Sequence, residues 1–186
     1  KSQRTTVGGI FQIITYGVPV GLGSHVHWDR KLDGQIGQSI LSINAVKGVE
    51  IGNGFENTTK KGKEVHDVII PDKNNIKNFK HISNHAGGIE GGMTNGEPII
   101  VNVAIKPIAT MTKPLPSVDI NTGEIVEAAY NRSDICQVSR ACPIGESMIA
   151  LTLANSFLEK FGGDSMLEIQ TNYTSFIKTH KKFGSK

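Results

Sequence analysis

A glycine-rich segment is the first part of the sequence whose residue types suit binding chemistry. Residues 87–96 (GGIEGGMTNG) contain five glycines. Because glycine has no side chain, the backbone N–H groups of such a segment can approach a flat ring or an anion closely. An ordinary flexible turn is the alternative interpretation of the same composition. The segment is therefore a candidate ligand contact.

A lysine follows at the end of the next apolar stretch. Lys106 stands directly before Pro107, which favours an extended conformation for the lysine, and Thr110 lies a few residues further on. An ammonium group with a hydroxyl nearby could bind a phosphate or an electron-rich heterocycle. A solvated surface lysine is the alternative.

A cation and a carboxylate stand close together at residues 132–134 (RSD). On a surface, a pair such as Arg132 and Asp134 contributes under about 1 kcal/mol. In a cleft, the guanidinium can bind an anion through two hydrogen bonds, and the carboxylate can move a proton. These two residues are therefore candidates for binding and proton transfer.

Histidines suggest a second kind of chemistry. His25, His27 and Asp29 would point the same way on a strand and could converge on a metal ion. A strand end with partly exposed polar residues is the alternative. His81 and His85 are four residues apart, but the glutamate of a HExxH zinc motif is absent.

Composition and missing motifs exclude several classes of protein. The net charge of +3 gives no electrostatic case for nucleic-acid binding. The sequence has no dinucleotide-binding GxGxxG, no P-loop and no GxSxG nucleophile motif. Cys136 and Cys142 do not have CxxC spacing, and charge-free stretches fall short of the ~20 apolar residues of a membrane span. With 186 residues and no signal-peptide pattern, we expect one soluble, cytoplasmic domain without nucleic-acid or membrane partners.

The hydrophobic pattern predicts strands that alternate with two apolar helices. Strands are expected near the start of residues 7–22, over 98–106, and over 125–130 after a hairpin turn at 119–124. Helices are expected from Asp33 to Lys47 and from about Pro143 to Phe161. A long, irregular, lysine-rich loop is expected at about 50–86.

The two predicted helices have almost no charges in their interiors, so we expect them to be buried on nearly every face. Hairpin-linked strands favour antiparallel sheets over a doubly wound parallel sheet. The sequence therefore predicts an α+β fold in which buried helices lie between antiparallel sheets.

Five segments, in order, resemble the chorismate synthase family. They are residues 23–33 (GSHVHWDRKLD), 42–52 (SINAVKGVEIG), 87–98 (GGIEGGMTNGEP), 106–110 (KPIAT) and 132–134 (RSD) followed by Glu146. One glycine-rich stretch would be a weak signal, but five ordered segments over nearly the whole chain are a specific one. The resemblance implies the family's β-α-β sandwich and its homotetrameric assembly.

The resemblance also implies a reaction. In this family, reduced FMN promotes the anti-1,4-elimination of phosphate from 5-enolpyruvylshikimate-3-phosphate, which gives chorismate in the shikimate pathway. NADPH is a possible source of the reducing equivalents. Asp134 matches the family's carboxylate beside the flavin N5 and C4a edge, and is the implied catalytic residue. The implied flavin contacts are Asn44, Ala45, Gly91, Lys106, Pro107, Ile108, Ala109, Thr110 and Arg132. We expect Gly91, Lys106, Arg132 and Asp134 to share one hollow.

Members of the family are about twice as long as this chain, and the resemblance covers only their rear half. The front half carries histidines that act as acids and arginines that bind substrate, which His25 and His27 do not match. We therefore expect the isolated chain to be a nearly inactive part of the enzyme. A metal-dependent hydrolase using His25, His27 and Asp29, and a non-enzymatic oligomerisation or flavin-binding module, remain as alternatives.

Overall fold

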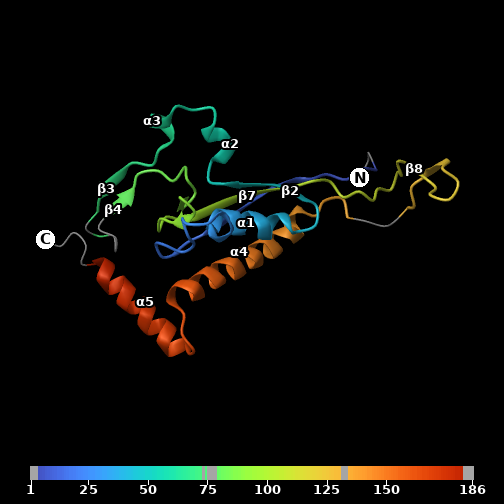
Figure 1. The fold of residues 1–186 in the computed structure, drawn as a ribbon. Coiled ribbons are helices and arrows are strands. Elements are labelled where there is room, and N and C mark those ends of the chain that lie inside the picture. The colour runs from blue at the N-terminus through green and yellow to red at the C-terminus, as the bar shows by residue number, and fades with distance from the viewer. Residues whose placement is uncertain (1–3, 73, 75–78, 131–133, 182–186) are drawn as a thin grey trace.

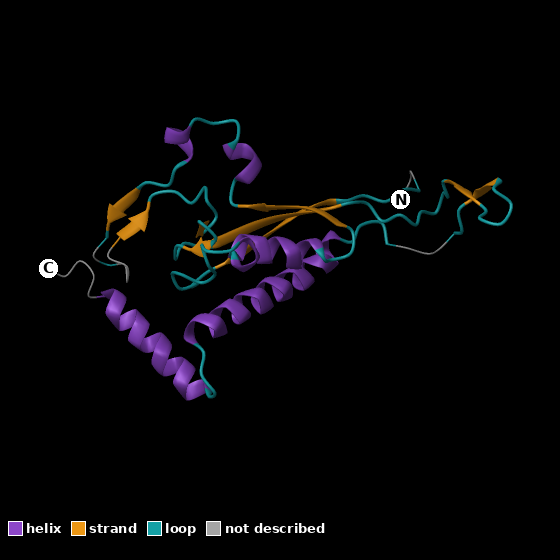
Figure 2. Ribbon diagram, in the orientation of Figure 1, coloured by secondary structure: helices purple, strands orange, loops and turns teal. Residues whose placement is uncertain are grey.

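A three-stranded antiparallel sheet forms the centre of the computed structural model, which describes residues 4–72, 74, 79–130 and 134–181. The strand order is β1 (Gly9–Thr15), β7 (Ile99–Ile105), β2 (Val46–Ile51), so the last strand in sequence lies between the other two (Figures 1 and 2). The side chains of β7 alternate between a fully buried and a half-buried face. This alternation confirms the predicted strand.

Two helices cover the buried face of the sheet. In α1 (Leu32–Leu41), three side chains at four-residue spacing are fully buried: Leu32, Ile36 and Ile40. Helix α4 (Val138–Phe161) lies beside α1 and crosses under β1 (Figure 1). Burial of each large aliphatic side chain contributes about 1.5–3 kcal/mol to the free energy of folding. The sheet and the two helices therefore hold most of the core.

A glycine allows α4 to approach the sheet closely. A Cβ atom at Gly145 would lie 2.9 Å from Ile13 Cδ1 and 2.9 Å from Phe11 Cε2 on β1. Any larger residue would push the helix away from the strand. Gly145 is therefore a packing residue.

The opposite face of α4 is apolar but exposed. Ile144, Leu151 and Leu158 are 50%, 63% and 49% exposed. The expected burial of this helix on nearly every face is therefore wrong for the chain described here. Among the described residues, α4 is long and apolar enough to cross a membrane by length and composition alone, a test that core helices of soluble proteins also pass.

Helix α5 (Met166–Lys181) packs against the end of α4 through aromatic side chains. The ring of Phe161 lies 5.3 Å from that of Tyr173 and 5.2 Å from that of Phe176, measured between centroids. This cluster turns the chain back after Gly162 and Gly163, where the sequence predicted the helix to end.

Residues 52–72, 74 and 79–86 belong to an arm with short elements on the side of the sheet away from α4 (Figure 1). These elements are α2 (Gly54–Asn57), α3 (Gly62–Val65) and the hairpin of β3 (Ile69–Pro71) and β4 (Phe79–His81). The glycine-rich segment that follows the arm forms the hairpin of β5 (Ile89–Glu90) and β6 (Met93–Thr94), and β6 contacts α1. A 3-10 turn, η1 (Trp28–Arg30), precedes α1.

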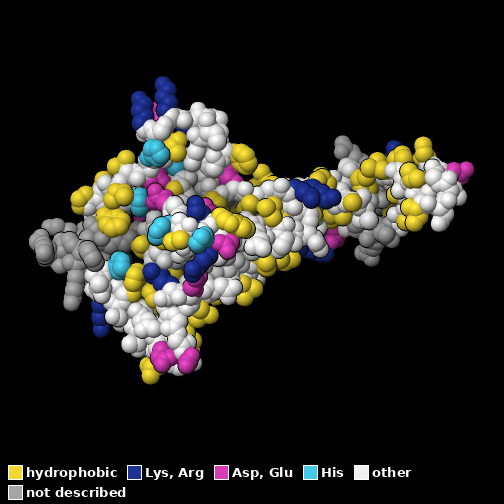
Figure 3. Space-filling view, viewed as in Figure 1, with side chains coloured by type: hydrophobic (Ala, Val, Ile, Leu, Met, Phe, Trp, Pro, Cys, Tyr) yellow, Lys and Arg dark blue, Asp and Glu magenta, His cyan; other side chains and the backbone are white. Residues whose placement is uncertain are grey.

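A third hairpin, β8 (Pro116–Val118) with β9 (Ile125–Glu127), projects from the opposite end of the molecule. Every residue of its two strands is exposed, and apolar side chains gather along it in Figure 3. The hairpin turn is confirmed, although the second strand ends at Glu127 rather than at Tyr130.

The predicted helix boundaries were less accurate. The first helix ends at Leu41 instead of Lys47, because Val46–Ile51 pairs with β7 as a strand. The second helix begins at Val138, before Pro143, which lies inside the helix. The mixed helix and antiparallel-sheet class is confirmed.

Candidate functional site

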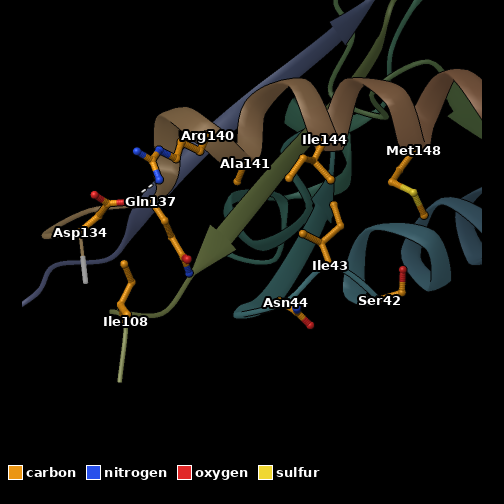
Figure 4. A pocket seen from close by; sticks show the side chains of 10 residues that line it. All are labelled: Ser42, Ile43, Asn44, Ile108, Asp134, Gln137, Arg140, Ala141, Ile144 and Met148. Atoms are coloured by element: carbon orange, nitrogen blue, oxygen red, sulfur yellow. Dashed lines mark ion pairs between the residues drawn. The ribbon is translucent and has the colours of Figure 1, made fainter. Parts of the chain in front are cut away.

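A cavity of about 430 Å³ lies where the end of α1, the loop after β7 and the start of α4 meet (Figure 4). This size is within the range of small-molecule sites. Its lining is Ser42, Ile43, Asn44, Ile108, Asp134, Gln137, Arg140, Ala141, Ile144 and Met148. In Figure 4, Ile43 and Ile144 point toward one another, and Gln137 reaches from the start of α4, which it precedes, toward Ile108. The cavity therefore has an apolar part beside a polar one.

The turn after α1 is built by backbone hydrogen bonds. The N–H of Ile43 donates to the carbonyl of Ile40, and the N–H of Val46 donates to the carbonyl of Ile43, both at 3.1 Å. Ala45 has a φ of +68°, which residues with a side chain seldom adopt. The left-handed residue reverses the chain and leaves Asn44 at the cavity.

Two further contacts fix the loop after β7. The N–H of Lys106 donates to the carbonyl of Ala45 at 2.9 Å. The buried Thr6 donates through its hydroxyl to the carbonyl of Ile108 at 2.5 Å. These contacts bring Ile108 to the same cavity as Asn44.

The segment before α4 is held by the same N-terminal stretch. The N–H of Val7 donates to the carbonyl of Ile135 at 2.8 Å. Beside it, the carboxylate of Asp134 accepts an ion-pair contact from Arg140, with 2.5 Å between Oδ2 and Nη1 (Figure 4). The side chains of Asp134 and Arg140 are 49% and 75% exposed, so this pair lies at the open rim of the cavity.

The structure brings together some of the residues predicted for the site. Asn44, Ile108 and Asp134 line the cavity, and Ala45 adjoins Asn44 in the chain. The remaining members of the KPIAT segment flank Ile108 without lining the cavity: Lys106, Pro107, Ala109 and Thr110. Arg132 lies outside the described residues.

Gly91 is not brought to this cavity. It lies in the exposed turn between β5 and β6, with a φ of +60°, and its neighbour Gly92 accepts a hydrogen bond from the N–H of Leu32 at 2.9 Å. Leu32 begins α1, whereas the cavity lies beyond the end of α1. Ten helical residues rise about 15 Å, so the length of this helix separates the turn from the cavity.

Several lining residues were missed in the sequence. Gln137, which precedes α4, and Arg140, Ala141, Ile144 and Met148 within it recur every one to four residues, and the spacing places them along one side of the helix. Starting the helix at Pro143 hid this periodicity, because the first three of these residues then fell outside it. A helix begun five residues earlier would have revealed the cavity wall.

Histidines in the arm have structural partners. The side chain of His81 is only 3% exposed, and its Nδ1 and Nε2 lie 3.1 Å and 3.7 Å from carboxylate oxygens of Glu97 and Glu90. His85 Nδ1 lies 2.9 Å from the carbonyl oxygen of Val65. The His81 contacts connect the arm to Glu90 and Glu97, and the His85 contact lies within the arm.

A buried carboxylate holds two parts of the arm together. Asp67 accepts hydrogen bonds from the Ser83 hydroxyl at 2.6 Å and from the N–H groups of His85 and Ala86, both at 2.9 Å. Burial alone would raise the pKa of Asp67, but the hydrogen bonds from Ser83, Ala86 and His85 outweigh it, and the pKa is lowered. Asp67 is therefore held in its charged form.

The metal-site alternative gains no support from the described residues. His25, His27 and Asp29 are exposed, and the chain there forms a bend followed by the 3-10 turn η1 instead of the expected strand. In the part of the chain that the structure describes, no group of three or more histidine, cysteine or acidic side chains could hold a metal ion.

Comparisons with known proteins agree on one family. The family model described as Chorismate synthase matches residues 1–158. Chorismate synthases of Geotalea daltonii, Desulforudis audaxviator and Thermoanaerobacter pseudethanolicus are 50%, 52% and 50% identical over 98%, 96% and 98% of this chain. The chain spans 48%, 45% and 52% of their lengths, or about half.

A solved crystal structure of a chorismate synthase is 39% identical to this chain, with a TM-score of 0.80. The match covers 98% of this chain and 46% of that one. Sequence and fold thus agree over nearly all of the residues, and the chain belongs to the chorismate synthase family.

Proposed function

We propose that the full-length protein containing this chain catalyses the elimination of phosphate from 5-enolpyruvylshikimate-3-phosphate to give chorismate, with reduced FMN as cofactor. Identity of about 50% to named chorismate synthases over almost all of this chain carries the proposal. The proposal concerns the full-length protein because the relatives are about twice as long as the chain. This chain would supply one part of the active site.

The lining of the cavity fits a flavin. Ile43, Ile144 and Met148 offer apolar contact for an aromatic ring system, and Asn44 and Gln137 offer amides that can donate and accept hydrogen bonds at a polar ring edge. When bound, a reduced flavin would supply electron density as phosphate leaves and recover it as the C6 proton is lost.

The residues of this chain would then have distinct roles. Asp134, at the rim, would hold or receive a proton. The apolar side chains of Ile43 and Ile144 would exclude water, which strengthens electrostatic interactions inside the cavity. The backbone turn at Ala45 would fix the position of Asn44. Gly91 and Arg132 remain proposed flavin contacts from the family resemblance.

The lysine-rich arm is proposed as a positively charged flap. The substrate carries one phosphate and two carboxylates, and Lys61 and Lys63 at α3 are exposed. Exposed cations attract such an anion at long range and raise its local concentration. We further propose that the full-length protein is a cytoplasmic homotetramer and that NADPH is the source of flavin reduction.

An anaerobic assay tests the function. Purified full-length protein is mixed with reduced FMN and 5-enolpyruvylshikimate-3-phosphate, and chorismate is measured by absorbance and chromatography. We expect chorismate from the full-length protein and almost none from residues 1–186 alone. Absence of chorismate from a folded full-length protein that binds FMN would overturn the proposal. That same result, FMN binding without turnover, would favour the flavin-binding module.

A further inference from the structure

We propose that Arg140 is a positioning residue for Asp134, so that the guanidinium sets the direction in which this carboxylate faces the cavity. The inference rests on the proposed function and assigns a role to a residue that the sequence motifs do not include. Both side chains line the cavity, and Oδ2 of Asp134 lies 2.5 Å from Nη1 of Arg140.

The two partners differ in how firmly they are held. Arg140 lies in the first turn of α4, where the N–H groups of Arg140 and Ala141 both donate to the carbonyl of Gln137 at 3.1 Å. The neighbouring Ala141 is buried against the core. Arg140 therefore projects from a rigid element.

Asp134, in contrast, lies in the irregular segment before the helix. The backbone hydrogen bond at Ile135 fixes the path of the chain there, but it leaves the χ angles of Asp134 free. Within the described residues, Arg140 is the cationic partner of this carboxylate. A planar guanidinium restricts the orientation of a carboxylate more than an ammonium group does. Arg140 thus supplies the orientation that the backbone does not.

The chain offers a matched comparison at the other end of α4. Arg30 forms an ion pair with Glu159, and these side chains are 53% and 50% exposed. Neither residue lines the cavity. Both arginines pair with a carboxylate at an end of the same helix, so loss of either removes a similar amount of charge and surface contact. Only Arg140 acts on a residue of the site.

The experiment uses the full-length protein with the substitutions Arg140→Gln, Arg140→Lys, Asp134→Asn, Arg30→Gln and the double change of Arg140→Gln with Asp134→Asn. The readouts are kcat, KM for 5-enolpyruvylshikimate-3-phosphate, and the absorbance spectrum of bound FMN. We expect Arg140→Gln to lower kcat about tenfold with little change in KM, because a displaced reacting group loses rate rather than binding.

The double variant separates positioning from a structural role. If Arg140 acts through Asp134, Arg140→Gln lowers kcat in the wild-type protein but has no further effect in the Asp134→Asn protein. Arg140→Lys should restore part of the rate, and Arg30→Gln should match the wild type.

Two results would overturn the inference. One is equal activity of Arg140→Gln and Arg30→Gln; the other is the same fold-loss from Arg140→Gln in both backgrounds. If Arg140→Gln does not fold, Arg140→Lys in the two backgrounds gives the same comparison. An inactive wild-type protein would instead count against the proposed function, so the two failures are distinguishable.

Discussion

The backbone N–H of Lys106 donates a hydrogen bond to the carbonyl oxygen of Ala45, 2.9 Å away, and thereby joins the end of β7 to the turn that follows α1. Neither side chain takes part. The cavity is therefore positioned by main-chain geometry, and the left-handed backbone of Ala45 is the feature on which that geometry depends.

Substitution of Ala45 tests this dependence. A β-branched side chain is strained at a φ of +68°, so Ala45→Val should lower the free energy of unfolding by about 1–2 kcal/mol and weaken FMN binding. Ala45→Gly is the control, because glycine adopts this backbone without strain. Thermal unfolding and flavin titration of the full-length protein measure both effects. Equal behaviour of the two variants would show that the turn tolerates other conformations.

Asp67 should make the stability of the arm depend on pH. Its pKa is lowered in the folded protein, so its carboxylate stabilises the fold above the ordinary aspartate range, and this contribution is lost as the pH falls through the folded-state pKa. Asp67→Asn should cost about 2 kcal/mol at neutral pH, since it removes hydrogen bonds to a buried charge.

Unfolding midpoints measured from neutral pH down into the acid range check this prediction. The difference between the wild type and Asp67→Asn should shrink as the pH falls. Asp164→Asn changes an exposed carboxylate and should leave the curve unaltered. A constant difference at all pH values would mean that Asp67 acts through shape rather than charge.

Two helical glycines should respond in opposite ways to alanine. Gly145→Ala should destabilise the protein by about 1–3 kcal/mol, because the new methyl group would lie 2.9 Å from side-chain atoms of Phe11 and Ile13. At Gly37, in α1, the nearest atom to an added Cβ is Val49 Cγ1 at 3.9 Å. Gly37→Ala should therefore stabilise the helix by up to about 1 kcal/mol. Chemical denaturation of both variants measures the contrast, and stabilisation by both would disprove the close packing of α4 on β1.

The arm lysines should influence capture of the substrate more than its conversion. Replacing Lys61 and Lys63 together by Gln should raise KM for 5-enolpyruvylshikimate-3-phosphate several-fold, leave kcat nearly unchanged, and reduce the dependence of KM on salt. The charge-matched control replaces two other exposed lysines, Lys113 and Lys178, by Gln. An unchanged KM in the first variant would remove the arm from the proposed site.

Local patterns in the sequence predicted the type of each helix and strand better than the residues at which the elements end and contact one another. The alternation of β7 was predictable because one face of the strand is buried, which imposes a period of two. The end of α1 was not, because residues 46–51 become a strand only by pairing with β7. The local pattern of this segment is compatible with a helix, but its pairing with β7 makes it a strand.

The candidate site shows the same division. The segments containing Asn44, Ile108 and Asp134 could be assigned from the family motifs, and the structure brings these residues together. Arg140 was overlooked because the helix start was placed too late, beyond it. The separation of Gly91 from the cavity depends on which end of α1 each loop packs against, and no local pattern encodes that choice.

The position of β7 in the sheet also determines when the sheet can form. Among the described residues, the partner of each outer strand in this sheet is β7, so β1 and β2 acquire this partner only after the ribosome has released residue 105. Strand pairs that are far apart in sequence form slowly. Until they form, the apolar side chains of β1 and β2 are exposed and can aggregate. Prolonged exposure of two unpaired strands during synthesis is the expected consequence of a central strand that is translated after both of its neighbours.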